Sequence, residues 1–273
     1  MATDTVRTGT VRANGTELYH EIRGDGPPVV CIAGATGDAG GFTPMAELLA
    51  DSYTVVTYDR RGNSRSPRPD GWTTTNVEEQ ADDCAALIEA LGLERPAVFG
   101  ISGGGLILVG LIQRHADTLR GAIAHEPVLL SVSPETATAF GELMSSMADA
   151  ADPLESMMRF GRWVSGEDRF EAMNAEFDAQ LLERMFGNMD VTFGIEAGLM
   201  TFVPDADALA RVEIPVHASY GELNEGTFWP EGARWLTEAT SGTLHALPGA
   251  HGQLADELPA FVDALQTILA SMP

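Results

Sequence analysis

The segment at residues 100–104, with the sequence GISGG, is the part of this chain that points most directly to a chemical reaction. It matches the pattern G-x-S-x-G, in which a serine stands on a tight turn between a strand and a helix and small flanking residues relieve the crowding. The apolar residues 97–100 predict the strand, and residues 103–114 predict the helix. Such a turn would expose the hydroxyl of Ser102 as a nucleophile for a carbonyl carbon.

An attacked carbonyl needs hydrogen-bond donors for the negative charge that forms on its oxygen. The backbone N–H of Gly103, at the start of the predicted helix, is one candidate donor. The second donor is expected in the glycine-rich loop that follows the apolar residues 29–32, and by position we assign it to Ala35. We therefore predict an oxyanion hole made by the N–H groups of Ala35 and Gly103.

A serine nucleophile also needs a base, and histidine is the usual one. The chain has six histidines. His251 alone follows the last predicted strand, where the base of a G-x-S-x-G site is expected. His217 and His245 lie within predicted strands and His115 lies at the end of a predicted helix, so packing roles suit them better. We predict His251 as the base.

The acid that orients the base is expected after the strand predicted at residues 214–220. That position holds Asn224, and an amide cannot stabilise the imidazolium that forms during proton transfer. The other carboxylates near this position are Glu222 and Glu225. Both stay open as alternatives for the acid.

The strand predicted at residues 121–126 offers a different acid, because it ends in Glu126. The carboxyl ends of parallel strands meet at one edge of a sheet, so Glu126 should lie on the same edge as Ser102. His125 precedes Glu126 and should point to the opposite side of the strand. We assign the acid to Glu126.

Strand and helix patterns alternate along most of the chain, after a hairpin around Asn14-Gly15 at residues 5–23. Strands are expected at 29–32, 53–58, 97–100, 121–126, 214–220 and 242–247, and helices at 42–49, 76–91, 103–114, 229–238 and 253–270. This order predicts an α/β fold with a mostly parallel eight-stranded sheet flanked by helices. The sheet domain would comprise residues 1–130 and 206–273, and residues 131–205 would form a helical cap.

The predicted cap is rich in methionine, with eight of the eleven methionines of the chain. Methionine adapts to irregular apolar shapes, which suits a pocket for apolar ligands. We therefore expect the cap to line a substrate pocket above Ser102. The predicted lining residues are Met144, Met157, Phe160, Trp163 and Met189.

The composition limits the classes of molecule that the protein is expected to bind. The chain has 40 acidic and 16 basic residues, which give a net charge of -24. A polyanion repels phosphate backbones and anionic lipids, so neither nucleic acid nor a membrane surface is an expected partner. A neutral small-molecule substrate fits better. The oligomeric state stays open, a homodimer included.

Cys31 and Cys84 have no CxxC spacing and no neighbouring His/Cys cluster, so neither a zinc site nor a redox site is expected. The predicted serine mechanism needs no metal or organic cofactor. Both should be buried free thiols. No apolar stretch reaches the roughly 20 residues that a membrane-spanning helix needs. Residues 1–5 lack a basic region followed by an apolar one, so no signal peptide is predicted and the expected location is the cytoplasm.

Together these residues make the chain resemble the α/β-hydrolase superfamily over nearly its whole length. Residues 58–66 (YDRRGNSRS) are similar to the D-x-R-G-x-G-x-S turn of that superfamily, although Asn63-Ser64 departs from its second glycine. We interpret this segment as a structural turn with buried ion pairs, not as a catalytic group.

The position of Glu126 narrows the resemblance to lactone-cleaving hydrolases of the zearalenone type. Ser102, the HEP segment at 125–127 and the LPGAH segment at 247–251 look like their counterparts in those enzymes. The resemblance implies hydrolysis of an ester or lactone bond. With the acidic composition and the methionine-rich cap, we predict a serine hydrolase that acts through an acyl-enzyme on a small, neutral, largely apolar substrate. A C–C bond hydrolase, a cofactor-free perhydrolase and a catalytically slow ligand-sensing protein remain alternatives on the same fold.

Overall fold

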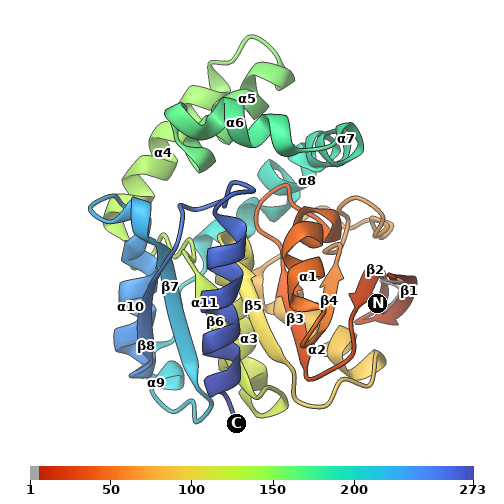
Figure 1. Cartoon of the computed structure of the whole chain (residues 1–273). Helices are drawn as coiled ribbons and strands as arrows, with labels where there is room; N and C mark the ends of the chain where they lie inside the picture. The colour runs from red at the N-terminus through yellow and green to blue at the C-terminus, as the bar shows by residue number, and fades with distance from the viewer. Residues whose placement is uncertain (1–5) are drawn as a thin grey trace.

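The computed structural model describes residues 6–273 (Figure 1). Its strands are β1 (Arg7–Ala13), β2 (Thr16–Arg23), β3 (Pro28–Ile32), β4 (Thr54–Tyr58), β5 (Ala97–Ile101), β6 (Gly121–His125), β7 (Val216–Gly221) and β8 (Thr243–Leu247). The first residue of the hairpin predicted at residues 5–23 and the segment on which the signal-peptide prediction rests both lie within residues 1–5. Both therefore fall outside the described residues.

The helices of the described chain follow the predicted alternation. They are α1 (Thr43–Leu49), α2 (Val77–Ala90), α3 (Gly103–His115), α4 (Pro134–Ala148), α5 (Pro153–Ser165), α6 (Glu167–Glu176), α7 (Ala179–Gly187), α8 (Met189–Phe193), α9 (Ala206–Leu209), α10 (Pro230–Thr240) and α11 (Leu258–Ser271). Short 3₁₀ segments are η1 (Ala39–Phe42), η2 (Ala116–Thr118), η3 (Ile195–Thr201) and η4 (Glu222–Asn224).

One eight-stranded sheet has the order β1-β2-β4-β3-β5-β6-β7-β8. β2 pairs antiparallel with β1 and β4, and the other neighbours are parallel, which confirms the predicted mostly parallel sheet. The chain moves outward from β3 to β4 and then returns to place β5 on the other side of β3. The crevice at the carboxyl ends of β3 and β5 is therefore the switch point at which open α/β sheets bind ligands.

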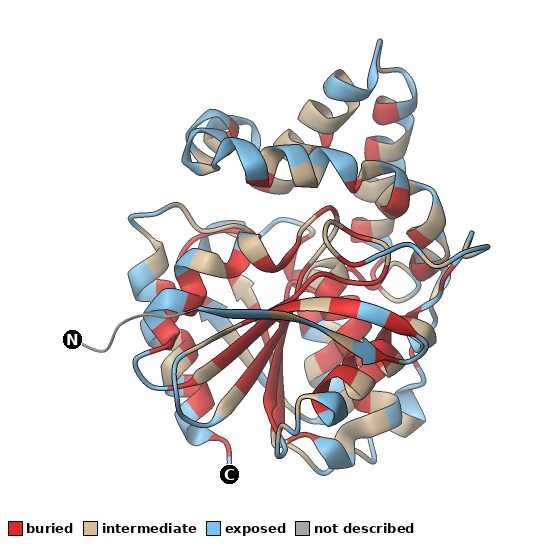
Figure 2. Ribbon diagram, turned by 90° about the vertical axis from the view of Figure 1, so that its right-hand side faces the viewer, coloured by how far each residue is buried: buried red, intermediate tan, exposed pale blue. Residues whose placement is uncertain are grey.

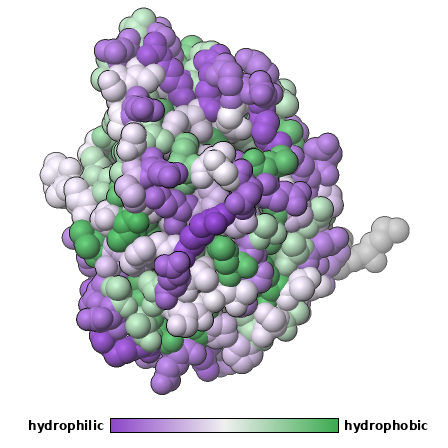
Figure 3. All heavy atoms as spheres, turned by 90° about the vertical axis from the view of Figure 1, so that its left-hand side faces the viewer, coloured by the Kyte–Doolittle hydropathy of each residue, from purple (hydrophilic) through white to green (hydrophobic). Residues whose placement is uncertain are grey.

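The helices α4 to α8, which we call the insertion helices, connect β6 to β7 and stand above the edge where the parallel strands end (Figure 1). In Figure 2 the central strands are buried, whereas the insertion helices carry mostly intermediate and exposed residues. Seen from the α10 side, hydrophilic residues cover most of the upper part of the surface, and hydrophobic ones are scattered below (Figure 3). The insertion helices therefore cover the edge of the sheet but share only a small hydrophobic core among themselves.

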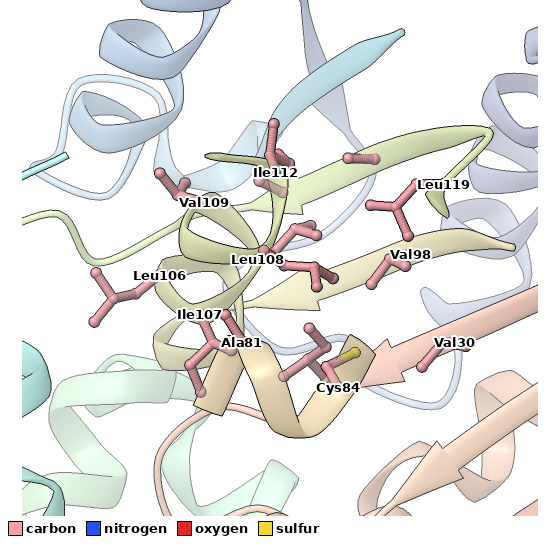
Figure 4. Close-up of a cluster of buried hydrophobic side chains, with 14 of the residues drawn as sticks. Val30, Ala81, Cys84, Val98, Leu106, Ile107, Leu108, Val109, Ile112 and Leu119 are labelled. Atoms are coloured by element: carbon pink, nitrogen blue, oxygen red, sulfur yellow. The ribbon is translucent and has the colours of Figure 1, made fainter. Parts of the chain in front are cut away.

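The core has two parts, because successive strand residues face opposite sides of the sheet. Val30 of β3 packs with α2 and α3 on one face of the sheet (Figure 4), and Ile32 belongs to the same cluster. Val29 and Cys31 pack with α1 and α11 on the other face. Cys31 and Cys84 are fully buried free thiols, as expected. Within residues 6–273 no cluster of three or more His, Cys, Asp or Glu side chains could hold a metal ion, and no helix has the length and apolarity to cross a membrane.

The boundaries of the predicted strands and helices lie within about two residues of the observed ones, except at the last helix. The helix expected from residue 253 begins at Leu258, because Pro259 suits a first helical turn and residues 253–257 form a separate turn in which Leu254 donates to the Glu257 carboxylate. Leu199 of η3, within the range assigned to the cap, belongs to the buried hydrophobic cluster that also contains residues of β3, α2 and α3.

Candidate active site

Ser102 occupies a strained turn between β5 and α3, with φ 57° and ψ -122°. Such a conformation is costly for a residue with a side chain and is typical of functional sites. Gly100 and Gly104, two residues to either side of it, have no room for a side chain. A methyl group at Gly100 would lie 2.5 Å from the Gly104 carbonyl oxygen, and one at Gly104 would lie 2.1 Å from the Ile32 carbonyl oxygen. The strand, the turn and the helix thus follow the G-x-S-x-G prediction.

The loop after β3 lies against Ser102, because β3 and β5 are neighbours in the sheet. A methyl group at Gly34 would come within 3.0 Å of the Ser102 Cβ atom. A methyl group at Gly103 would lie 3.5 Å from the backbone nitrogen of Ala35. The two expected oxyanion donors therefore come from backbone segments that lie side by side next to Ser102.

Three side chains hold the backbone of Gly34 and Thr36, the residues on either side of Ala35. Arg60 donates to the Gly34 carbonyl oxygen at 3.1 Å, and Asn188 donates to the Thr36 carbonyl oxygen at 2.9 Å. The Thr36 N–H donates to the Thr192 hydroxyl at 3.1 Å. Thr36 itself has φ 58°, a conformation that needs such support.

Arg60 belongs to the turn at residues 58–66, which has the ion pairs expected of it. The buried Arg60 pairs with Glu196 at 2.5 Å, and Arg61 pairs with Asp83 at 2.5 Å. Asp59 is fully buried, pairs with Arg65 at 2.7 Å and accepts a hydrogen bond from the Ala39 N–H. The turn is a structural device that also supports the loop beside Ser102.

His251 and Glu126 meet in a short hydrogen bond, with 2.6 Å between His251 Nδ1 and Glu126 Oε2. Glu126 follows β6 directly, is fully buried and has φ 44°. Its second oxygen, Oε1, accepts hydrogen bonds from the Gly221 N–H at 2.9 Å and from the Asn224 amide at 2.8 Å. Both carboxylate oxygens are therefore satisfied.

The surroundings of Glu126 favour its charged form. Burial raises the pKa of the Glu126 carboxyl, but the hydrogen bond and charge of His251, with help from His125 and the Asn224 amide, outweigh burial and lower the pKa below its usual value. A carboxylate held in this way can orient an imidazole and stabilise its protonated form.

Of the alternative acids, Glu225 is exposed and pairs with Arg234 at 2.6 Å, and Glu222 is exposed on η4. Asn224 stands where an aspartate was expected and donates to Glu126. The sequence contained this amide but gave no sign of its partner, because the contact joins residues 98 positions apart.

Sequence reasoning also missed Trp229, whose ring stacks on His251 with 3.8 Å between ring centroids and 24° between planes. Trp229 also packs against Trp163, which approaches from α5 with 4.7 Å between centroids. His251 is thus fixed at one edge by a carboxylate and across one face by an indole. His125 points to the other side of β6, as expected, and packs against Phe99 and Phe261.

Two cavities open on Ser102, between the sheet edge and the insertion helices. The larger has a volume of about 670 Å³, and the smaller has about 140 Å³. Of the residues expected to line a pocket, Met157 lines the larger cavity, Met144 and Trp163 line the smaller one, and Phe160 lines both.

Met189 is the exception, because it lines neither cavity. It begins α8 and packs instead against the small apolar cluster of Leu143, Met147 and Phe160 between the insertion helices. The physical reason is that α8 uses this residue for packing and turns Thr192 and Phe193 toward the site.

The chain is similar to known hydrolases. A family model described as alpha/beta hydrolase fold matches residues 27–153. An uncharacterized hydrolase of Bacillus subtilis, YraK, is 31% identical over 209 residues, which cover 76% of this chain and 74% of that protein. A zearalenone hydrolase of Cladophialophora bantiana is 26% identical over 265 residues, which cover 88% of this chain and 98% of that protein.

Among solved structures, an enol-lactonase from Burkholderia xenovorans superposes with a TM-score of 0.72 at 21% identity, over 96% of this chain and all of that one. At that identity the likeness extends to the fold alone. The arrangement of strands and helices is therefore shared with hydrolases of this kind.

Proposed function

Since the chain belongs to the α/β-hydrolase fold family, we propose that it is a serine hydrolase that cleaves a carboxylic ester or lactone bond in a small, neutral, largely apolar substrate. The observation that carries this proposal is the 2.6 Å hydrogen bond between His251 and the buried Glu126, at a cavity that Ser102 and His251 both line.

The first half of the reaction forms an acyl-enzyme. Because His251 Nδ1 holds the proton shared with Glu126, its Nε2 is free to accept the proton of Ser102. The Ser102 oxygen attacks the carbonyl carbon, and the N–H groups of Ala35 and Gly103 stabilise the negative charge on the carbonyl oxygen. His251 then gives its proton to the departing alkoxide, and the acyl group stays on Ser102.

The second half returns the free enzyme. His251 takes a proton from water, the resulting hydroxide attacks the acyl carbon, and the proton goes back to Ser102 as the acid leaves. During both halves the imidazolium is paired with Glu126 and stacked on Trp229, and both contacts favour a positive ring.

The walls of the larger cavity support an apolar, uncharged substrate. Its side chains are mainly apolar, and they include four phenylalanines and four methionines, among them Met158, Phe170 and Met173. Apolar walls with a few polar groups at one point are typical of sites that bind small apolar molecules.

The experiment is hydrolysis of p-nitrophenyl butyrate by the wild type and by Ser102→Ala, Glu126→Gln and Glu225→Gln, each checked for folding by circular dichroism. Ser102→Ala should abolish turnover, and Glu126→Gln should lower kcat by about 10³–10⁴-fold, since loss of the acid leaves the imidazolium unpaired. Glu225→Gln is the matched control, because this carboxylate is exposed and pairs with Arg234, and it should keep the wild-type rate.

Two results would contradict the proposal. Turnover that persists in a folded Ser102→Ala protein would rule out Ser102 as nucleophile. Turnover that survives Glu126→Gln but is lost in Glu225→Gln would move the acid to the strand after the insertion helices.

A further inference from the structure

The two cavities meet at Ser102 and are unequal, with volumes of about 670 Å³ and about 140 Å³. The residues that line both are Ala35, Ser102 and Phe160. An ester whose carbonyl carbon is attacked by Ser102 would therefore have one side in each cavity.

The two cavities differ in the catalytic groups that line them. His251 lines the larger cavity and is absent from the lining of the smaller one. Gly103, one of the expected oxyanion donors, lines the smaller cavity and is absent from the lining of the larger one. The proton donor His251 therefore lies on the side of the larger cavity, and the oxyanion donor Gly103 lies on the side of the smaller cavity.

We propose that the larger cavity binds the alcohol part of the ester and the smaller cavity binds the acyl part, so that the preferred substrates are short-chain acyl esters of bulky, neutral, apolar alcohols. This inference rests on the proposed function. In the tetrahedral intermediate the carbonyl carbon bonds to Ser102, the oxyanion, the leaving oxygen and the acyl chain. The leaving oxygen must lie beside His251 to receive its proton, and the oxyanion must lie beside Ala35 and Gly103, so the acyl chain takes the remaining direction.

Acylation and deacylation can both proceed with the ester bound in this direction. The Ser102 oxygen bonds to the acyl carbon, the bond from that carbon to the leaving oxygen breaks, and the Ser102 proton passes through His251 to that oxygen. The alcohol leaves through the larger cavity, and water takes its place beside His251 for deacylation. The acyl chain stays in the smaller cavity through both steps.

The walls of the smaller cavity limit the acyl chain. Phe140, Met144, Trp163 and Phe193 surround it with apolar surface, and Phe140 and Trp163 are packed edge to face. A closely packed wall of this kind rejects a group that is too large more strongly than one that is too small. In a lactone the acyl part and the alcohol part are joined in one ring. The ring would therefore have to extend from one cavity to the other beside Phe160, which lines both.

The test uses two isomeric esters that differ in the direction of the ester bond. In 2-naphthylmethyl acetate the bulky group is the alcohol, and in methyl 2-naphthylacetate it is the acyl part. After division by the rate of hydroxide-catalysed hydrolysis of each ester, kcat/KM should be about 100-fold higher for 2-naphthylmethyl acetate, a ratio in the range that pocket size supplies. A ratio near one, or a preference for the methyl ester, would overturn the proposal.

Two variants locate the preference. Met144→Ala and Phe140→Ala enlarge only the smaller cavity, so either should raise kcat/KM for methyl 2-naphthylacetate by about tenfold, and having both guards against one that folds poorly. Met158→Ala is the matched control, because it removes a methionine that lines only the larger cavity and should not raise the rate of the methyl ester. The same gain from Met158→Ala as from Met144→Ala would overturn the assignment of the two cavities.

Failure of this inference is distinguishable from failure of the proposed function. If p-nitrophenyl butyrate is hydrolysed and the isomer preference is absent or reversed, the hydrolase remains and the cavity assignment falls. If no ester is hydrolysed and Ser102 does not react with an aryl phosphonate, the proposed function itself is contradicted.

Discussion

His125 and Glu126 show how adjacent residues at a strand end can differ in charge state. Glu126 faces His251 and has donors at both oxygens, which favour the carboxylate. His125 lies on the other side of β6, fully buried, with Nδ1 3.0 Å from the Ser219 hydroxyl oxygen. Burial, together with the nearby His251, lowers the pKa of His125 to about 4, against the opposing influence of Glu126.

The lowered pKa of His125 predicts a loss of stability in mild acid. The unfolded chain binds a proton at this residue near pH 6.5 and the folded chain only near pH 4, so stability is complete above 6.5 and falls as the pH drops toward 4. At about pH 5 the loss from this residue should be about 2 kcal/mol. Urea unfolding at about pH 7.5 and pH 5 should show a smaller pH effect in His125→Gln than in the wild type. An equal pH effect in both proteins would contradict this assignment.

The sequence predicts functional side chains where the role depends on the residue type and on its position relative to a strand. Ser102, His251 and Glu126 were proposed in this way, and the fold brings them to one sheet edge. Trp229 and Asn224 escaped prediction because neither residue type implies a contact with an imidazole or a carboxylate. Their contacts depend on how the chain from η4 to α10 returns over the sheet edge.

At the scale of elements, α8 joins the insertion helices to the loop of the expected oxyanion donor. Thr192 on α8 and Asn188 just before it hold the two backbone groups of Thr36, the residue after Ala35. Asn188 is almost fully buried and also accepts from the Ser64 N–H at 2.7 Å. The insertion helices therefore position backbone beside Ser102 as well as lining the cavities.

This contact predicts a loss of rate without a loss of binding. Thr192→Val removes the acceptor for the Thr36 N–H at nearly constant shape and should lower kcat by about tenfold with little change in KM, because a displaced oxyanion donor weakens transition-state binding. Thr192→Ser keeps the hydroxyl and should restore most of the rate. Steady-state kinetics on p-nitrophenyl butyrate measure both.

The control for Thr192→Val is Arg68→Ala. Arg68 pairs with Asp190 on the same helix at 2.9 Å, but this pair is exposed and does not touch the loop. Exposed pairs contribute little to stability, so kcat should stay close to wild type. A fall in kcat in Arg68→Ala equal to that in Thr192→Val would show that general loosening of α8 is the cause.

The sequence predicted the sheet elements better than the insertion helices. Strands and helices on the sheet have apolar periodicities set by burial on one or two faces, as β3 illustrates with four buried residues in sequence. The insertion helices face cavities, so their apolar residues mark cavity walls as much as packing, and Met189 was assigned to the wrong surface for that reason. Contacts such as that of Thr36 with Thr192 join residues 156 positions apart and leave no local pattern.

The net charge of -24 affects how a charged substrate approaches the protein. The larger cavity is also negative, since among residues 6–273 Glu171 and Glu183 line it and no Arg or Lys does. A negative potential that extends from the mouth of the cavity would repel anionic esters and leave neutral ones unaffected. Salt shortens the range of this repulsion, from about 30 Å near 10 mM to about 8 Å near 150 mM ionic strength.

The charge therefore predicts different salt responses for two esters of similar size. For the singly charged mono-p-nitrophenyl succinate, kcat/KM should rise several-fold as ionic strength increases from about 10 mM to about 150 mM, whereas for p-nitrophenyl butyrate it should stay constant. The apolar smaller cavity also disfavours the succinate carboxylate, but desolvation lowers its rate at every salt concentration and does not alter the slope. Butyrylthiocholine, a cation, should respond in the opposite direction. Equal slopes for the three esters would mean that the acidic surface acts too far from the cavity mouth to select the charge of the substrate.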